Sequence, residues 1–508
     1  MNNKTLIASV SLGIAVISFL SDILTIFGAG KWIALGAIVI GLVVIVSKSL
    51  SDRNRNLQVP PSLTRFGFYY EPTPNWLSPE KRQELSDLAK AAFVLLLFEQ
   101  TETGCWGKSY LPRHLAKGEP MPLALGAITG TPFALLAISS YAERTNSETN
   151  NIGRAERLVH DSTNYAVFET LARLLQPDGS YLRGYKESYA GRDKVFESAR
   201  HEAGACLIRM LYGEITERDL RTIERLCMPM DDAVTYDYAV VSRLFFQVPY
   251  LDTIPFRLRL RVALKRKKLL AQLVREVQVA TAANIAGKSY MRHESINQWS
   301  TAWYILPLLT LPSISSAMRT TLLDRMRQFF LARSAGAITE SSLLPVEIGE
   351  AMRGQGMSAF GTGVGLLTWR TLERTIVNND VHSKQAQKMV DRFLKSAGEA
   401  IEAPMSNPSP EVPEGYLGWG AICLGAASVG IRIAYDDCKA SIALTEQLNT
   451  ETVNGRSQEE LETAYTHIIK TSRLLNPKYT IHVARVAAKL SFIYEPVKRT
   501  KKAIASIA

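Results

Sequence analysis

The sequence predicts an all-α protein, in which an N-terminal transmembrane helical hairpin precedes a ring of helical hairpins. Two long apolar runs joined by a short turn predict the membrane hairpin, since about 20 apolar residues cross a bilayer as a helix. From residue 78 to residue 475 helix follows helix, with no convincing period-two alternation that would indicate strands. Recurring helices rich in small residues predict the ring, because its inner helices are crowded on both flanks.

The membrane hairpin occupies residues 1–48. Residues 5–28 and 32–47 are almost continuously apolar and are separated by a turn of Gly, Ala, Gly and Lys. A cleaved signal peptide is the alternative, but the second apolar run would then remain after cleavage. Basic residues precede the first run and follow the second. The positive-inside rule therefore places both ends of the hairpin on the cytoplasmic side of the membrane, which we expect to be a bacterial-type inner membrane.

Asp22 lies inside the first apolar run. It marks the real turn of the hairpin, or it makes a polar contact within a homo-oligomer of hairpins. An ionisable residue within a membrane span is a functional hypothesis by default.

The rest of the chain divides by composition into a linker and two helical regions. Residues 49–77 are polar and rich in proline, which is typical of a linker. Residues 78–449 are the predicted ring, and residues 450–508 hold C-terminal helices and a basic tail.

The sequence predicts where two helices begin. Ser78 can cap a helix that continues with Pro79 and Glu80. Ser457 and Glu460 have the spacing of a capping box.

The small-residue helices repeat along the predicted ring. Their ranges are 130–141, 196–211, 297–309, 361–372 and 415–429. The string Gly-Lys-Ser-Tyr also occurs twice, at 107–110 and 287–290. Internal repetition of this kind is typical of fold units that bury their apolar faces against one another.

Two loops share a pattern in which a helix is followed by a Gln, a Gly and an aromatic residue. These residues are Gln100, Gly104 and Trp106 in the first loop and Gln176, Gly179 and Tyr181 in the second. Gly permits a turn that other residues resist, and the aromatic side chain can then fold back to pack on the next helix, while the Gln amide can hold free backbone groups.

The pattern resembles the Gln-Trp repeat of the terpenoid cyclase and protein prenyltransferase superfamily, whose fold is an α/α toroid. The resemblance implies an α/α toroid over residues 78–449, with a ligand cavity at its axis lined by the inner helices. The Asp-x-Asp-Asp acid motif of the cyclases does not occur here, and Asp436-Asp437-Cys438 supplies only part of the zinc site of the prenyltransferases. We therefore expect no metal and no cofactor, and any enzymatic activity would be cyclase- or transferase-like or directed at glycans.

The predicted cavity wall consists of the residues that open three inner helices. The candidate catalytic residues are Glu197, His201 and Glu202. The candidate substrate-binding residues are Arg200, His293, Glu294, Trp299, Tyr416 and Trp419. Carboxylates beside a histidine can perform general acid–base catalysis, and aromatic rings can stabilise cations or stack on sugars. The alternative is that the charged residues at 200–202 form a structural ion-pair cluster at a helix start.

The charge of the chain indicates what kind of partner it binds. The net charge of +11 indicates an anionic partner. The run from Arg257 to Arg275 mixes Arg and Lys with Leu and Val, which is typical of a helix that lies on anionic membrane lipid. A solvated outer face of the helix is the alternative, and we expect no nucleic acid, because no binding motif accompanies the charge.

The five dispersed cysteines indicate a reducing compartment and buried thiols.

Two functions are consistent with these features. In the first, a membrane-anchored toroid binds or processes an amphipathic ligand, such as an isoprenoid or a glycan-lipid. In the second, a non-enzymatic effector or sensor recognises a ligand or partner through the toroid, while its hairpin oligomerises or perturbs the bilayer. Fold resemblance alone does not choose between them.

Overall fold

The chain divides into two compact units, Met1–Val59 and Pro60–Ala508, and all described residues belong to the second. The computed structural model describes residues 73–100, 106, 131–142, 175, 177–179, 186–189, 192–195, 199–212, 215–229, 241–242, 244–245, 254–285, 363, 366–367, 370, 380–402, 416–451 and 453–498.

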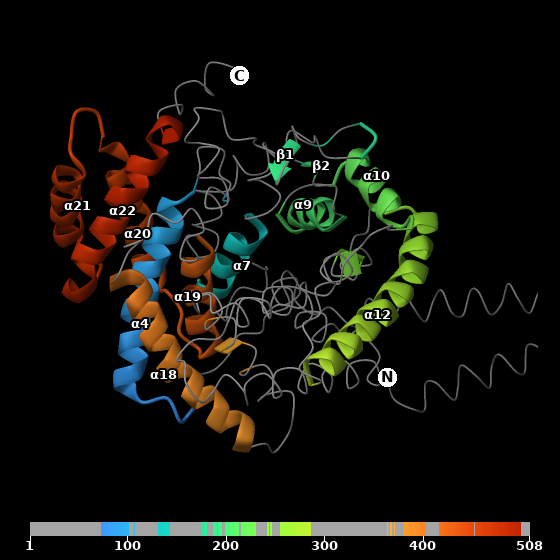
Figure 1. Ribbon diagram of the computed structural model, residues 1–508, viewed down its shortest axis with the longest axis horizontal. Helices are drawn as coiled ribbons and strands as arrows, with labels where there is room; N and C mark the ends of the chain where they lie inside the picture. The colour runs from blue at the N-terminus through green and yellow to red at the C-terminus, as the bar shows by residue number, and fades with distance from the viewer. Residues whose placement is uncertain are drawn as a thin grey trace, which may run out of the picture. The chain divides into compact units, whose positions relative to one another are not determined.

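Helices make up most of the described residues (Figure 1). They are α4 (Pro79–Phe98), α7 (Thr131–Tyr141), α9 (Ala199–Tyr212), α10 (Glu217–Leu226), α12 (Phe256–Ile285), α18 (Asp380–Glu402), α19 (Tyr416–Ser428), α20 (Tyr435–Thr450), α21 (Gln458–Ser472) and α22 (Pro477–Lys498). The all-α prediction is confirmed at this level. Within the ranges that the structure describes, none of the helices combines the length and the apolar character needed to cross a membrane. The predicted hairpin of residues 1–48 lies outside those ranges.

One short antiparallel hairpin departs from the all-helical expectation. Strand β1 (Lys186–Tyr189) pairs with β2 (Arg192–Val195), with Lys186 opposite Val195 and Tyr189 opposite Arg192. Each strand has four residues and lacks apolar alternation, so the period-two signal that reveals longer strands was absent.

Both predicted helix starts are confirmed. The Ser78 hydroxyl accepts a hydrogen bond of 3.3 Å from the backbone nitrogen of Lys81 at the start of α4. At the start of α21, the Ser457 hydroxyl accepts from the nitrogen of Glu460 at 3.2 Å, and the Glu460 carboxylate accepts from the nitrogen of Ser457 at 2.7 Å. These bonds satisfy backbone N–H groups that a helix leaves without an internal partner.

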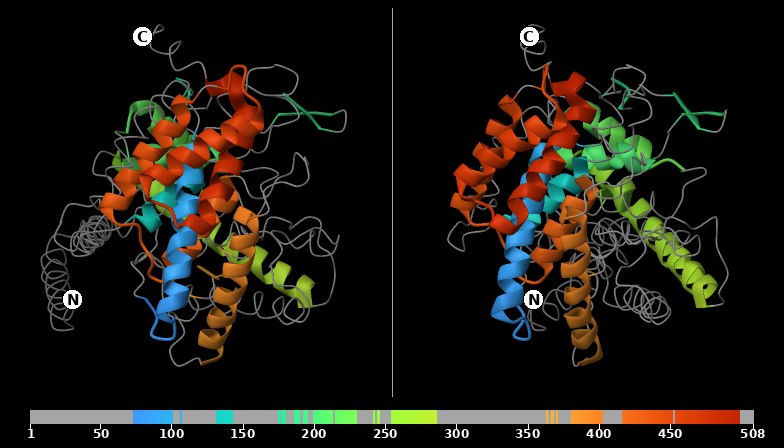
Figure 2. Two further views of the ribbon diagram at one scale, coloured as in Figure 1. Left: turned by 90° about the vertical axis from the view of Figure 1, so that its left-hand side faces the viewer. Right: turned by 60° about the vertical axis from the view of Figure 1, so that its left-hand side comes forward.

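Helix α19 is enclosed by other helices. It packs against α4, α7 and α18, and the side chains described from residue 418 to residue 428 are all buried. Figure 2 shows α4 running beside α18 and α19, although these segments are distant in the sequence. A Cβ atom at Gly425 would lie 2.6 Å from the ring of Phe393 on α18. A small residue is therefore required where these two helices meet.

The C-terminal helices pack onto the same core. Helix α20 contacts α4, α21 pairs with α22, and α22 contacts both α4 and α18. The Tyr465 hydroxyl of α21 and the Ser491 hydroxyl of α22 are 2.9 Å apart in a buried position, so the α21–α22 pair satisfies its own polar groups.

Candidate functional site

The first Gln-Gly-aromatic loop is anchored by Trp106. Its side chain is fully buried, and its indole nitrogen donates a hydrogen bond of 2.9 Å to the carbonyl oxygen of Leu96. Leu96 belongs to the last turn of α4, where carbonyl groups lack partners within the helix. The prediction that this aromatic side chain is buried is confirmed, but its hydrogen bond goes to the preceding helix, whereas the prediction was packing on the next helix. Gly104 lies outside the described residues.

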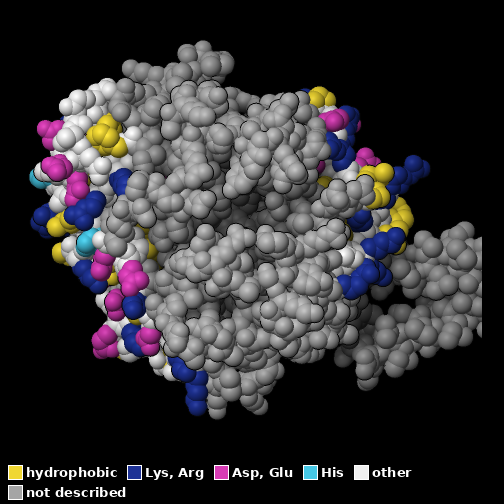
Figure 3. Space-filling model, in the orientation of Figure 1, with side chains coloured by type: hydrophobic (Ala, Val, Ile, Leu, Met, Phe, Trp, Pro, Cys, Tyr) yellow, Lys and Arg dark blue, Asp and Glu magenta, His cyan; other side chains and the backbone are white. Residues whose placement is uncertain are grey.

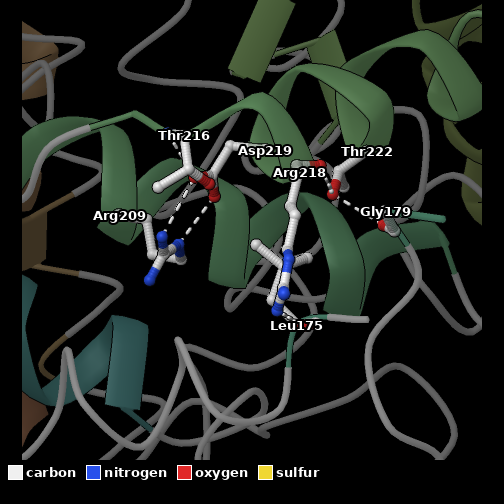
Figure 4. Close-up of polar contacts among 7 residues, drawn as sticks. All are labelled: Leu175, Gly179, Arg209, Thr216, Arg218, Asp219 and Thr222. Atoms are coloured by element: carbon white, nitrogen blue, oxygen red, sulfur yellow. Dashed lines mark hydrogen bonds and ion pairs between the residues drawn. The ribbon is translucent and has the colours of Figure 1, made fainter. Parts of the chain in front are cut away.

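The second loop is held against α10 through its backbone. Gly179 has a φ of +81°, and its carbonyl oxygen accepts a hydrogen bond of 2.6 Å from the Thr222 hydroxyl. Arg218 donates to the carbonyl oxygen of Leu175 at 3.2 Å (Figure 4). A Cβ atom at residue 179 would lie 2.5 Å from the nitrogen of Thr222, so the predicted need for glycine is confirmed here. Gln176 and Tyr181 lie outside the described residues.

A buried ion pair joins α9 to α10 (Figure 4). The Arg209 guanidinium donates to the two carboxylate oxygens of Asp219, at 2.6 and 3.0 Å. The same carboxylate accepts from the backbone nitrogen of Thr216 at 2.8 Å and from its hydroxyl at 2.6 Å. These bonds offset the cost of removing two charges from water. Burial and the adjacent Asp219 charge also raise the pKa of the Cys206 thiol well above its usual value.

The candidate catalytic residues lie at the start of α9, which begins at Ala199. Glu197 precedes the helix and lies outside the described residues. Arg200 and His201 belong to the first turn, but their side chains are not described. The Glu202 side chain is 15% exposed, and its Oε1 lies 3.6 Å from Nη2 of Arg225 on α10.

Arg225 also reaches the second loop. Its Nη1 lies 3.6 Å from the carboxylate of Asp178. Glu202 therefore takes part in a charged network that joins α9, α10 and the loop before them. This geometry favours the structural ion-pair interpretation for Glu202.

The candidate binding residues of α19 are placed in part. Tyr416 is the first residue of the helix, and its side chain is not described. Trp419 is buried, and its indole nitrogen donates a hydrogen bond of 2.8 Å to Oε1 of Glu99, which is also buried. His293, Glu294 and Trp299 lie outside the described residues.

The basic run from Arg257 to Arg275 lies within helix α12, as the sequence predicts. Its apolar residues do not share one face. Leu258, Val262, Leu269 and Leu270 are buried in the core, whereas Leu260 and Leu264 are exposed. The physical reason is that the apolar residues lie on two opposite sides of this helix, so one set packs inward and the other remains outside.

Asp436, Asp437 and Cys438, the partial match to a zinc site, lie in the first turn of α20. Asp437 pairs with Lys90 of α4 at 2.6 Å, and Cys438 is buried. Across the described ranges, no group of three His, Cys, Asp or Glu side chains could hold a metal ion. Cys206, Cys423 and Cys438 are buried as predicted, and Cys227 is half-buried.

Several residues that organise this region were not predicted. Glu99, Arg209, Asp219 and Arg225 all pair with residues on another helix or at a helix start. The sequence contained a signal for Asp219 alone, since Thr216 and Asp219 have capping-box spacing. The partners of the other three depend on how helices meet.

The described residues thus define an all-α protein in which two loops are bound to helices. The Trp106 indole bonds to α4, and the carbonyl oxygen of Gly179, which has a positive φ, bonds to α10. Comparison of the chain with known protein families, with curated protein sequences and with solved structures gave no match.

Proposed function

We propose that this chain is a membrane-anchored α/α-toroid protein that binds or processes an amphipathic ligand, of the isoprenoid or glycan-lipid kind, in a central cavity. The membrane hairpin of residues 1–48 anchors it, and the toroid of residues 78–449 holds the ligand on the cytoplasmic side. The resemblance to the terpenoid cyclase and protein prenyltransferase superfamily supplies the ligand class.

The observation that carries this proposal is the enclosure of α19 by other helices. An inner helix of a toroid needs small residues on several sides, because neighbours crowd it from both flanks. Helix α19 has them, and its Gly425 leaves no room for a Cβ atom beside Phe393. Helix α7, also rich in small residues, packs against α19 and α9. Both packings support an inner ring.

The loop contacts give independent support. A toroid of helical hairpins needs loops that hold each hairpin to the next. Gly179 makes such a contact with α10, and Trp106 holds its own loop to the preceding helix, α4. The carbonyl oxygens of Leu175 and Pro177 also accept hydrogen bonds from Arg218 and Arg221 of α10, so this loop is held at several points.

The bound ligand can be identified directly. The full chain would be purified from membranes in a mild detergent, and its lipid extract analysed by mass spectrometry. We expect a polyisoprenoid or glycan-lipid at near-stoichiometric amount, with loss of that species in the Trp299→Ala and Tyr416→Ala variants. The matched control is Phe492→Ser, since Phe492 is exposed on α22. An extract that contains only bulk phospholipid would contradict the ligand class.

A second function, the non-enzymatic effector or sensor, is favoured by one contact. Because Glu202 is paired with Arg225, it is better suited to joining helices than to transferring protons. Glu197→Gln, His201→Ala and Glu202→Gln variants would each keep full cellular function under this alternative. Deletion of residues 1–48 separates the two further, since an enzyme would keep some activity in vitro and an effector would lose all function.

A further inference from the structure

Helix α12 carries apolar side chains on its exposed side. Phe256, Leu260 and Leu264 are 69%, 52% and 60% exposed, and they recur every four residues, so they form one stripe along the helix. Met228, which follows α10, is 64% exposed. Its carbonyl oxygen accepts a hydrogen bond of 2.7 Å from Nζ of Lys265, so Met228 lies beside the N-terminal half of α12.

This stripe is not the part of α12 that holds the helix in the protein. Leu258, Val262 and Leu269 are buried and lie on the opposite side of the helix, at spacings of four and seven residues. The helix is therefore docked through one apolar face and presents a second one outward. Large exposed apolar side chains in a row indicate an interaction surface, whereas isolated ones do not.

Cations surround the exposed stripe. Between residues 257 and 275 the chain has eight basic residues and no acidic residue: Arg257, Arg259, Arg261, Lys265, Arg266, Lys267, Lys268 and Arg275. Arg257, Lys267, Lys268 and Arg275 are exposed. Arg261 is paired at 3.3 Å with Glu224 of α10, and both side chains are well exposed. Figure 3 shows Lys and Arg gathered with hydrophobic side chains at the right-hand edge of the view, where Figure 1 places α12.

We propose that the exposed stripe of Phe256, Leu260 and Leu264, together with Met228, inserts into the surface of an anionic bilayer, while the neighbouring cations bind lipid headgroups. The inference rests on the proposed membrane attachment and adds the side chains that would meet the lipid. An acyl-chain boundary accepts the apolar stripe, and the negative surface accepts the cations. A protein partner would need its own row of acidic residues, whereas an anionic leaflet supplies that charge everywhere.

The geometry changes which residues would touch lipid. The sequence groups Leu258 and Val262 with Leu260 and Leu264, but the first two are buried in the core. A substitution at Leu258 would therefore disturb folding. A substitution at Leu260 or Leu264 would alter membrane contact while sparing the core.

The test places an environment-sensitive fluorophore on the full chain reconstituted in vesicles. Single cysteines at Leu260→Cys and Leu264→Cys would be labelled with a nitrobenzoxadiazole probe, in a background carrying Cys105→Ser and Cys227→Ser. Ile481→Cys is the matched control, since Ile481 is an exposed apolar residue on α22. Vesicles would contain either phosphatidylglycerol or phosphatidylcholine alone, each with and without a quencher on the acyl chains.

With phosphatidylglycerol, we expect probes at 260 and 264 to shift to shorter emission wavelength and to be quenched from the acyl chains. Both effects should fall in high salt and be lost in phosphatidylcholine, and the probe at 481 should show neither. A chain that floats with vesicles while probes at 260 and 264 stay aqueous would overturn this surface and leave the membrane anchor standing. A chain that floats with neither kind of vesicle would overturn the anchor as well. A shift to shorter wavelength that the acyl-chain quencher does not reduce would indicate a protein occupant and also contradict the proposal.

Discussion

The indole nitrogen of Trp419 donates a hydrogen bond of 2.8 Å to a carboxylate oxygen of Glu99, which lies 320 residues earlier in the chain. Trp419 is in the first turn of α19, and Glu99 is the C-terminal cap of α4. Both side chains are buried. A buried polar group that loses its hydrogen-bond partner costs stability, so this contact is well placed to hold α19 on α4.

Trp419→Phe should lower the free energy of unfolding by about 2–3 kcal/mol, because the buried carboxylate loses a donor. Glu99→Gln should cost less, since the amide oxygen can still accept from the indole. Denaturant titration of the full chain, followed by circular dichroism, measures both. Equal stability of Trp419→Phe and the parent chain would contradict the role given to this bond.

The indole of Trp106 should contribute to stability in two separable ways. Trp106→Phe removes the hydrogen bond to the Leu96 carbonyl but keeps much of the apolar volume, so we expect a loss of about 1 kcal/mol. Trp106→Ala also leaves a cavity, which raises the loss to about 3–5 kcal/mol. Thermal and denaturant unfolding of the two variants provide the comparison. A Phe variant as unstable as the Ala variant would show that the bond, and not the packing, dominates.

The Arg209–Asp219 pair should show strong energetic coupling. Arg209→Met leaves the Asp219 charge buried without its guanidinium, which should cost about 3–5 kcal/mol. In the double variant Arg209→Met/Asp219→Asn the charge is gone, and Asn can still accept from the backbone of Thr216. We expect the double variant to recover part of the loss. A double-mutant cycle measures this coupling, and simple additivity of the two single effects would argue against it.

Gly179 and Gly455 form a matched pair for testing the contact between the second loop and α10. Both have positive φ, +81° and +75°, so an Ala at either should cost about 1–2 kcal/mol of backbone strain. Only at Gly179 would the new Cβ also meet the backbone of Thr222, whereas nothing lies within 4 Å of a Cβ at Gly455. Gly179→Ala should therefore lower the free energy of unfolding by at least about 1 kcal/mol more than Gly455→Ala. Similar losses for the two variants would count against a tight contact between this loop and α10.

Cys227 should react slowly at neutral pH. Burial raises the pKa of its thiol from 9.0 to about 11, against the opposing effect of Lys265 and Arg261. At pH 8 its thiolate fraction should be roughly a hundredfold below that of an unperturbed thiol, and alkylation should keep accelerating up to about pH 11. Peptide-resolved mass spectrometry after timed iodoacetamide treatment reports the rate.

The same shift has a consequence for stability. Because the folded-state pKa of Cys227 lies above its ordinary value, folding favours the protonated thiol. Its contribution is fully present below pH 9 and is lost as the pH rises from about 9 to about 11. Cys227→Ser should remove this part of the alkaline loss. A variant with an unchanged alkaline stability profile would show that other groups account for it.

The sequence alone determined the features that depend on neighbours along the chain. Ser78 and Ser457 marked helix starts, because a side-chain oxygen within one turn can satisfy free backbone N–H groups. The small-residue run at 415–429 indicated a crowded helix, and α19 is enclosed by its neighbours. Gly179 was identified as a turn residue, because few other residues tolerate positive φ.

Only the tertiary structure decided which groups from distant segments meet. The pairing of Trp419 with Glu99 and of Glu202 with Arg225 depends on helix packing, which residue spacing does not encode. In α12, apolar residues lie on two opposite sides of the helix, so periodicity could not tell the buried Leu258 from the exposed Leu260. The physical reason is that burial is a property of what covers a side chain, and in this protein the cover comes from helices far away in the sequence.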